Sequence, residues 1–441
     1  MNPSRAANST VAAALAEAQH DYRAQHPKSL AQYEAACGAM PGGNTRASIF
    51  VEPFPLTIVR GEGAHLWDLD GHEYVDFLAE FTAGLFGHSH PGIRRAIDAA
   101  LDDGWNFGAH GLAEARFARA VCDRFPAIER VRFTNSGTEA NLMAVSLACA
   151  VTGRAKVLVF QGGYHGGVFY FRGAGSRVNA PFQFLLAEYN DAAAARTLVA
   201  PHTDDLAAIL VEPMLGGSGC IPGTRDFLAD LRALADETGA ILILDEVMTS
   251  RLAPGGLQQV HGIRPDMTTL GKYVGGGMSF GAFGGKAELM QRFDPRRPDH
   301  LEHAGTFNNN VVTMNAGYVG LTEIYTPERA CELNRFGDSL RKRLNAIVGC
   351  RGVAMQFTGL GSMIGVHMTD RPIRNETDAR QGNAALLDLF WFDLLARGIW
   401  FAKRGMMALS IALDDNDCDK LAAAVEEFAD TRAPLFEGSR R

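Results

Sequence analysis

The sequence predicts an α/β fold built on a mainly parallel β-sheet with helices on its faces. Short aliphatic and β-branched runs recur along the middle of the chain, and the stretches between them are long enough for a crossover helix. These runs lie at residues 131–133, 156–160, 206–211 and 240–244. Another run, 280–285, follows Lys272 too closely for a helical crossover, so we expect this strand to be antiparallel to its neighbour.

Size and composition predict a two-lobed globular protein. The chain has 441 residues, and single hydrophobic cores stop growing near roughly 250 to 300 residues. A net charge of −8 gives no basic footprint for nucleic acid. The seven cysteines form no Cys-x-x-Cys pair, so neither a disulfide framework nor a zinc knuckle is expected. There is also no long uncharged apolar run and no signal-peptide pattern, which leaves the cytoplasm as the expected location.

The amino-terminal segment predicts helix followed by a break. Residues 9–37 have a helical pattern, with Ser9 or Thr10 as a possible cap. Turn residues at 40–45 end that pattern and lead to Arg46. Taken alone, Arg46 is better interpreted as a solvated surface arginine than as a ligand for a substrate.

Residues 56–77 predict a β-hairpin with Asp70 and Gly71 at its turn. The Asp-x-Asp-Gly pattern that begins at Asp68 superficially resembles a calcium loop, but the later carboxylates are missing. His88 and His90 have no third ligand candidate nearby. The sequence therefore predicts no metal site.

Polar residues follow the predicted strands, at the sheet edge where active sites of such folds collect. Ser136, Gly137 and Thr138 follow the first run and open a helix. Their backbone N–H groups and hydroxyls suit a phosphate, although simple helix capping would also explain them. Tyr164, in a glycine-rich loop after the second run, could stack on a planar ligand or be a core tyrosine. Glu212 ends the third run.

Two further residues carry charge at strand ends. Asp245 directly follows four aliphatic residues, and a buried carboxylate there needs a cationic partner. That partner could be a protonated pyridine nitrogen or an arginine. Lys272 precedes three glycines, whereas a nucleotide-binding P-loop has its lysine after them. An exposed lysine is the simplest alternative, but burial would lower its pKa and free its amine for Schiff-base chemistry.

Phosphate turn, aromatic ring, carboxylate and lysine together meet the requirements of a pyridoxal 5'-phosphate site. The segments 135–140, 162–166, 211–213, 245–249 and 268–272 resemble those of the class III aminotransferases of fold type I, and the resemblance extends from about Pro41 to past Ser410. It implies a large domain with a mainly parallel seven-stranded sheet and a smaller α+β domain from both termini. The expected division is 1–85 (arm and part of the small domain), 86–325 (large domain) and 326–441 (small domain).

The resemblance also implies roles for individual residues. Lys272 would carry the cofactor and act as catalytic base, and Asp245 would pair with the pyridine nitrogen. The phosphate would bind to Ser136, Gly137 and Thr138. Tyr164 and Val247 would enclose the ring, with Glu212 nearby. Thr306 matches a threonine that reaches a phosphate across a subunit interface, which implies a homodimer.

Departures from the nearest branch, that of glutamate-1-semialdehyde aminomutase, favour a different substrate. The segment 305–311 lacks the aminomutase pattern, and Arg404 stands in a region where the aminomutases carry a glutamate. The β-amino acid (β-phenylalanine type) aminotransferases are more similar. They imply that Arg46 binds the donor carboxylate, that Arg404 binds a 2-oxo acid, and that Phe81 and Phe86 help form an apolar pocket. An aminomutase, an ω-transaminase of other amines and a non-catalytic cofactor-binding protein remain alternatives.

Overall fold

The computed structural model describes residues 10–105 and 107–437. Among these residues, the largest sheet has seven strands in the order β4-β12-β11-β10-β7-β5-β6. Its strands are β4 (Arg130–Thr134), β5 (Lys156–Phe160), β6 (Gln183–Ala187), β7 (Leu206–Val211), β10 (Ile241–Asp245), β11 (Met267–Gly271) and β12 (Gly281–Gly285). Strand β12 is antiparallel to both of its neighbours, and the other pairings are parallel. The predicted mainly parallel sheet is therefore confirmed, together with the antiparallel strand that follows Lys272.

Alternate residues of the central strands pack on opposite faces of this sheet. The covering helices are α5 (Gly137–Thr152), α6 (Ala192–Val199) and α7 (Arg225–Thr238). Leu158 and Phe160 of β5 join the core cluster that contains side chains of α6 and α7. Val157 and Val159 join the cluster on the α5 side. Because both faces are covered, an apolar residue is favoured at every position, and all of β7 is buried.

The sequence pattern did not predict strand β6. Only Ala187 of its five residues is buried, and Gln183 and Leu186 are exposed. This strand is at the edge of the sheet, where one side is open to solvent, so a continuous apolar run is not required.

The two terminal segments of the chain meet in a second sheet, of order β1-β2-β3-β15, in the described part of the chain. Strand β15 comes from the carboxyl-terminal segment and pairs in parallel with β3. The strands of this sheet are β1 (Ile58–Glu62), β2 (His65–Asp68), β3 (Glu73–Asp76) and β15 (Ile399–Trp400). The pairing does not locate domain boundaries, so the division at residues 85 and 325 stays a prediction.

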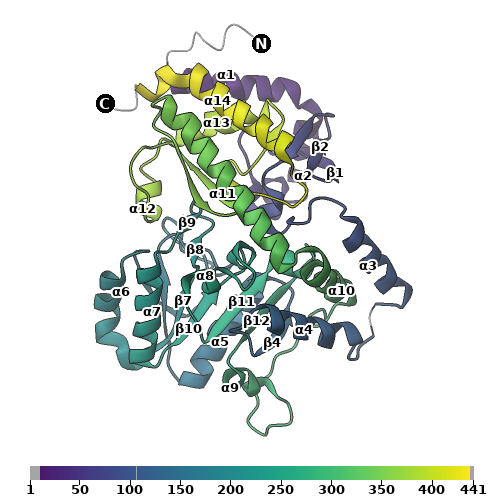
Figure 1. Cartoon of the computed structure of the whole chain (residues 1–441), viewed down its shortest axis with the longest axis vertical. Helices are drawn as coiled ribbons and strands as arrows, with labels where there is room; N and C mark the ends of the chain where they lie inside the picture. Colours follow the sequence, from purple (N-terminus) through teal and green to yellow (C-terminus); the bar gives the residue numbers. More distant parts are fainter. Residues whose placement is uncertain (1–9, 106, 438–441) are drawn as a thin grey trace.

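The remaining elements surround these two sheets. Figure 1 shows α1, α13 and α14 together at one end of the molecule, the seven-stranded sheet toward the other end, and α11 running between them. The helices are α1 (Val11–Gln25), α2 (Pro27–Cys37), α3 (Pro91–Asp102), α4 (Leu112–Arg124), α8 (Leu257–His261), α9 (Ala287–Met290), α10 (Val311–Val319), α11 (Pro327–Cys350), α12 (Glu376–Ala379), α13 (Ala384–Leu395) and α14 (Asp415–Glu437). The remaining strands are β8 (Met214–Leu215), β9 (Ile221–Pro222), β13 (Gln356–Leu360), β14 (Met363–His367) and β16 (Met406–Ala408). Among the described residues, no helix is long and apolar enough to cross a bilayer.

The helical pattern predicted over 9–37 is confirmed for most of its length, but the helix is broken at His26. Helix α1 ends at Gln25, and α2 begins at Pro27, with His26 in a non-helical conformation between them. The break has a local cause, because proline disfavours the helical conformation of the residue before it. Thr10 caps α1 by accepting a hydrogen bond from the Ala13 N–H, whereas Ser9 lies outside the described residues.

The hairpin predicted over 56–77 is confirmed in the antiparallel pair β2-β3. Gly71 has a φ of +99°, which the turn requires and glycine tolerates. Asp68 Oδ1 accepts hydrogen bonds of 2.8 Å from the N–H groups of Gly71 and His72. These hydrogen bonds place the carboxylate of Asp68 beside His72 at the turn.

Candidate active site

Lys272 lies where β11 ends and a 3₁₀ turn over 272–275 begins. Its φ of +55° is unusual for a residue with a side chain, which marks a strained position of a kind that concentrates at functional sites. Burial lowers the pKa of its amine to about 8, with the positive charges of Arg404 and Arg46 acting in the same direction. The unprotonated amine is therefore far more abundant near neutral pH than in an ordinary lysine, although the protonated form still predominates below pH 8.

Asp245 ends β10, and its buried carboxylate is held by three donors. Its Oδ2 accepts from Asn141 Nδ2 and lies 2.8 Å from His165 Nδ1, while its Oδ1 accepts from the Val247 N–H. Among the described residues, no lysine or arginine forms an ion pair with this carboxylate. The arginine partner considered from the sequence is therefore not found, and the carboxylate can accept a cationic ligand.

The turn Ser136–Thr138 opens the sixteen-residue helix α5, as the sequence predicted. Ser136 caps the helix by accepting from the Glu139 N–H, so capping and a phosphate role are compatible. The helix N-terminus adds the positive end of the macrodipole. A Cβ at Gly137 would lie 2.9 Å from the side chain of Val247, so glycine allows the turn to approach Val247 closely.

Tyr164 and Val247 come from different strand ends. Tyr164 is 41% exposed and its ring meets Tyr170 edge to face, which leaves area for stacking. Glu212 is buried below this loop and accepts hydrogen bonds from the N–H groups of Tyr164 and Gly216. Burial raises the pKa of Glu212 to about 7. The structure therefore gives Glu212 a role in holding the backbone of the Tyr164 loop.

Arg46, Arg404 and Phe81 converge although they come from separate parts of the chain. The Cζ atoms of Arg46 and Arg404 lie 5.6 and 4.6 Å from the ring centroid of Phe81. Arg46 forms an ion pair with Glu80, and both side chains are about half exposed. Arg404 has no ion pair with a described carboxylate, and its buried Nε has no hydrogen-bond partner among the described residues. Burial lowers the pKa of Arg404 to about 10, so it stays a cation at neutral pH.

The segment that carries Glu80 and Phe81 has an unusual backbone. Ala79, Glu80, Phe81 and Thr82 all have positive φ values, between 45° and 80°. Each such residue costs free energy, so the surrounding structure must hold this left-handed turn in place. The turn brings Phe81 to the two arginines and Glu80 to Arg46.

Two predicted residues lie apart from this group. Phe86 is buried in the main core with Ile93, and its ring is 6.4 Å from that of His90, centroid to centroid. Phe81 belongs to a different core cluster. Thr306 is exposed on a loop that Asn308 joins to the phosphate turn through a 3.0 Å hydrogen bond from Asn135 Nδ2.

Four residues of the site were missed in the sequence. Asn141 and His165 hold Asp245, Thr269 Oγ1 donates to Asn141 Oδ1, and Glu80 pairs with Arg46. Asn141 and His165 lie next to residues that the motifs singled out, so their proximity to the motifs was the available signal. Thr269 lies inside the segment 268–272 and Glu80 directly precedes Phe81, so the same signal was available for these two residues.

These residues fit pyridoxal 5'-phosphate by the chemistry of their groups. A helix N-terminus suits the phosphate, an open tyrosine ring suits the planar ring, and a buried carboxylate without a lysine or arginine suits a pyridinium nitrogen. The lysine with a lowered pKa supplies the amine. Fold and site together define an enzyme built for carbonyl chemistry on a phosphate-bearing planar cofactor.

Comparison with known proteins agrees with this class. The family model "Aminotransferase class-III" matches residues 48–427. The chain is 54% identical over 415 residues to the beta-phenylalanine transaminase of Variovorax paradoxus, covering 94% of this chain and 95% of that protein. It is 38% identical over 417 residues to a glutamate-1-semialdehyde 2,1-aminomutase of Nitratidesulfovibrio vulgaris, covering 90% and 98%. The chain therefore belongs to the class III aminotransferases, and the protein is a transaminase.

Solved structures agree with the fold. A beta-phenylalanine aminotransferase from Variovorax paradoxus superposes with a TM-score of 0.95 at 52% identity, covering 97% of this chain and 99% of that one. A transaminase with PLP bound superposes with a TM-score of 0.84 at 31% identity, covering 94% and 99%. The expected fold type I architecture is confirmed.

Proposed function

We propose that this transaminase moves the amino group of an aromatic β-amino acid, of the β-phenylalanine type, to a 2-oxo acid such as 2-oxoglutarate. Pyridoxal 5'-phosphate is the cofactor, and the two half-reactions follow a ping-pong sequence. The observation that carries the proposal is the convergence of Arg46 and Arg404 on Phe81, within electrostatic reach of Lys272. The 54% identity to a beta-phenylalanine transaminase supports the same substrate class.

Two guanidinium groups suit the two carboxylates that must be bound in turn. Guanidinium groups bind carboxylates through paired hydrogen bonds. Arg46, which is partly exposed and paired with Glu80, would receive the carboxylate of the donor. Arg404, buried and without a carboxylate partner among the described residues, would receive that of the acceptor. Phe81 and the apolar residues packed with it would contact the aromatic side chain of the donor.

The chemistry requires a proton to be moved between two carbon atoms. Pyridoxal 5'-phosphate, when bound, supplies a sink for the electrons released when the donor carbon loses its proton. Lys272 Nζ, whose lowered pKa favours the unprotonated amine, would remove that proton and return it to the cofactor. Asp245, held by Asn141 and His165, would keep the pyridine nitrogen protonated. Ser136, Gly137 and Thr138 would bind the phosphate, and Tyr164 and Val247 would enclose the ring.

A homodimer would complete the site through Thr306. Its loop carries the exposed ring of Phe307 and is joined to the segment before α4 by a 3.4 Å hydrogen bond from Asn309 Nδ2 to Ala109 O. Trp105 and Phe107 of that segment are also exposed, as is Leu112, the first residue of α4. Exposed apolar patches of this kind mark interaction surfaces.

A cytoplasmic location is consistent with seven free thiols.

Absorbance spectroscopy of the purified holoenzyme tests this proposal. Addition of 3-amino-3-phenylpropanoate should bleach the yellow band of the lysine-bound cofactor, and 2-oxoglutarate should restore it. The Lys272→Ala variant, which retains the phosphate turn, should bind cofactor without completing this cycle. Bleaching only with simple amines would assign an ω-transaminase, and turnover of an amino aldehyde without any acceptor would assign an aminomutase. A normal rate in Lys272→Ala would overturn the assignment of the base.

A further inference from the structure

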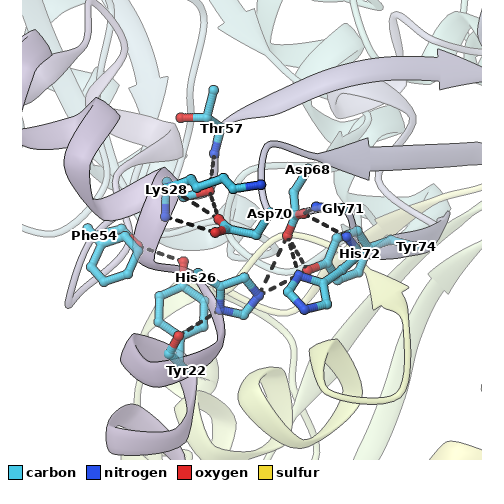
Figure 2. Close-up of polar contacts among 11 residues, drawn as sticks. Tyr22, His26, Lys28, Phe54, Thr57, Asp68, Asp70, Gly71, His72 and Tyr74 are labelled. Atoms are coloured by element: carbon cyan, nitrogen blue, oxygen red, sulfur yellow. Dashed lines mark hydrogen bonds and ion pairs between the residues drawn. The ribbon is translucent and has the colours of Figure 1, made fainter.

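A cluster of two histidines and one aspartate lies apart from the residues of the active site. His26 comes from the break between α1 and α2, and Asp68 and His72 come from the β2-β3 hairpin. Figure 2 shows the two imidazole rings directed toward the Asp68 carboxylate. Asp68 Oδ2 is 3.0 Å from His72 Nδ1 and 3.6 Å from His26 Nε2. One ligand atom from each of the three residues lies within 4.8 Å of the others.

The hydrogen bonds of this cluster leave a lone pair facing a carboxylate. His26 Nδ1 lies 2.7 Å from the carbonyl oxygen of Tyr22, so Nδ1 carries the proton of a neutral ring and Nε2 carries the lone pair. Nε2 faces Asp68 Oδ2, which is also an acceptor. The single hydroxyl proton of Tyr74, 2.8 Å from Asp68 Oδ2 and 3.2 Å from His26 Nε2, can serve only one of the two atoms. His72 Nδ1, 3.0 Å from the same Asp68 oxygen, can donate to it when Nδ1 carries a proton, and can coordinate a cation when it does not. A cation between them would satisfy both.

The supporting contacts are those that metal-binding side chains need. A ligating imidazole usually donates its other N–H to a carbonyl or carboxylate, as His26 does to Tyr22. Asp68 is oriented by the N–H groups of Gly71 and His72 through its other oxygen. His26 and Asp68 are 4% and 1% exposed, so the geometry is fixed by burial.

A cavity of about 180 Å³ lies beside these residues. Its lining includes His26 and His72 together with Asp21 and Glu73. No lysine or arginine is among the described residues that line it. The cavity therefore favours a cation and leaves space for water at an open coordination position.

We propose that His26, Asp68 and His72 form a binding site for a divalent transition-metal ion, with Zn²⁺ as the best match. Two imidazoles and a carboxylate suit zinc, whereas calcium requires oxygen ligands throughout. A bound ion would link His26, between α1 and α2, to the β2-β3 hairpin, so its role is structural. The sequence pattern around Asp68 predicts no metal site, because His26 lies far earlier in the chain and only the fold brings it to Asp68.

Zinc titration of the metal-stripped holoenzyme tests the proposal. The enzyme is treated with a chelator, freed of it, and titrated with ZnCl₂ by calorimetry, with bound zinc counted by mass spectrometry. One ion per chain is expected. His72→Ala should weaken binding more than about 100-fold, since even changes around the ligands cost 10- to 100-fold. His20→Ala removes an exposed histidine of α1 and should bind as the wild type does.

Two further measurements separate this site from adventitious binding. X-ray absorption of the zinc-loaded enzyme should show only nitrogen and oxygen neighbours at about 2.0 to 2.2 Å. Sulfur neighbours near 2.3 Å would assign the zinc to the exposed Cys37, Cys331 or Cys350 and overturn the proposal. Tyr74→Phe should weaken zinc binding about 10- to 100-fold.

Thermal unfolding gives the last readout. Zinc should raise the Tm of the wild type and of His20→Ala but not that of His72→Ala, because binding stabilises only the folded chain that holds the site. His26→Gln serves as a second ligand variant if His72→Ala folds poorly. Absence of stoichiometric zinc in the wild type would show that the cluster is held by hydrogen bonds alone. A zinc affinity equal to that of the wild type in both His72→Ala and His26→Gln would show the same.

Discussion

The guanidinium of Arg404 lies over the ring of Phe81, with 4.6 Å between its Cζ and the ring centroid. Phe81 reaches that position through a turn in which four successive residues have positive φ. The strained turn therefore supports the one buried guanidinium of the site that has no carboxylate partner among the described residues. Such a group is suited to bind a substrate carboxylate.

Arg404→Ala should weaken the acceptor half-reaction. Loss of a charge-assisted contact costs about 1.5 to 3 kcal/mol, which is roughly 10- to 150-fold in the KM for 2-oxoglutarate. Steady-state kinetics with varied acceptor measures this. Arg60→Ala, which removes an exposed arginine stacked on Trp67, is the matched control and should leave KM unchanged. An unaltered 2-oxoglutarate KM in Arg404→Ala would remove this role.

Arg46→Ala should instead impair the donor half-reaction. Its guanidinium pairs with Glu80, so the donor carboxylate must compete with that ion pair. We expect the KM for 3-amino-3-phenylpropanoate to rise about tenfold or more, and the KM for 2-oxoglutarate to change little. Single-turnover bleaching by the donor separates the two effects. Equal losses in both half-reactions would contradict the division of roles between Arg46 and Arg404.

His165→Ala should lower the rate through Asp245. His165 Nδ1 lies 2.8 Å from Asp245 Oδ2 in a buried network, and loss of a hydrogen bond to a charged group costs about 1.5 to 3 kcal/mol. We expect kcat to fall about tenfold or more while KM for the donor stays nearly constant, because His165 is buried and contacts the Asp245 carboxylate. His20→Ala, on the surface of α1, is the control. A change confined to KM would contradict the positioning role.

Reconstitution of the apoenzyme should depend on the protonation of Lys272. Its pKa is lowered to about 8 by burial, so the unprotonated amine dominates only above that pH. The rate of cofactor attachment, followed by absorbance, should rise about tenfold per pH unit below 8 and level off above it. A midpoint near the ordinary value of 10.5 would show that the lysine is not desolvated in solution.

Leu112→Glu should weaken the proposed dimer. Leu112 is 94% exposed and lies close in the chain to Trp105 and Phe107, which are also exposed. A charge buried in an apolar interface is costly, so sedimentation should show more monomer and activity should fall on dilution. Val260→Glu places the same charge on an exposed apolar residue elsewhere and should leave assembly intact. A monomeric wild type would overturn the proposal itself.

The local pattern of the sequence predicted much of the fold and part of the site. Strands β5 and β7 were located correctly, because buried parallel strands need continuous apolar runs. The edge strand β6 was not predicted, because one of its sides is open to solvent and a continuous apolar run is not required there. The break at His26 was missed although Pro27 marks it.

By itself, the sequence determined the strand ends and the residues directly attached to them, such as Ser136, Asp245 and Lys272. Their positions follow from short-range patterns of apolar runs, glycines and caps. The tertiary structure alone decided which distant side chains meet: Arg46 with Arg404 across Phe81, and His26 with Asp68. Such encounters depend on the packing of segments far apart in the chain, and periodicity within a segment carries no information about them.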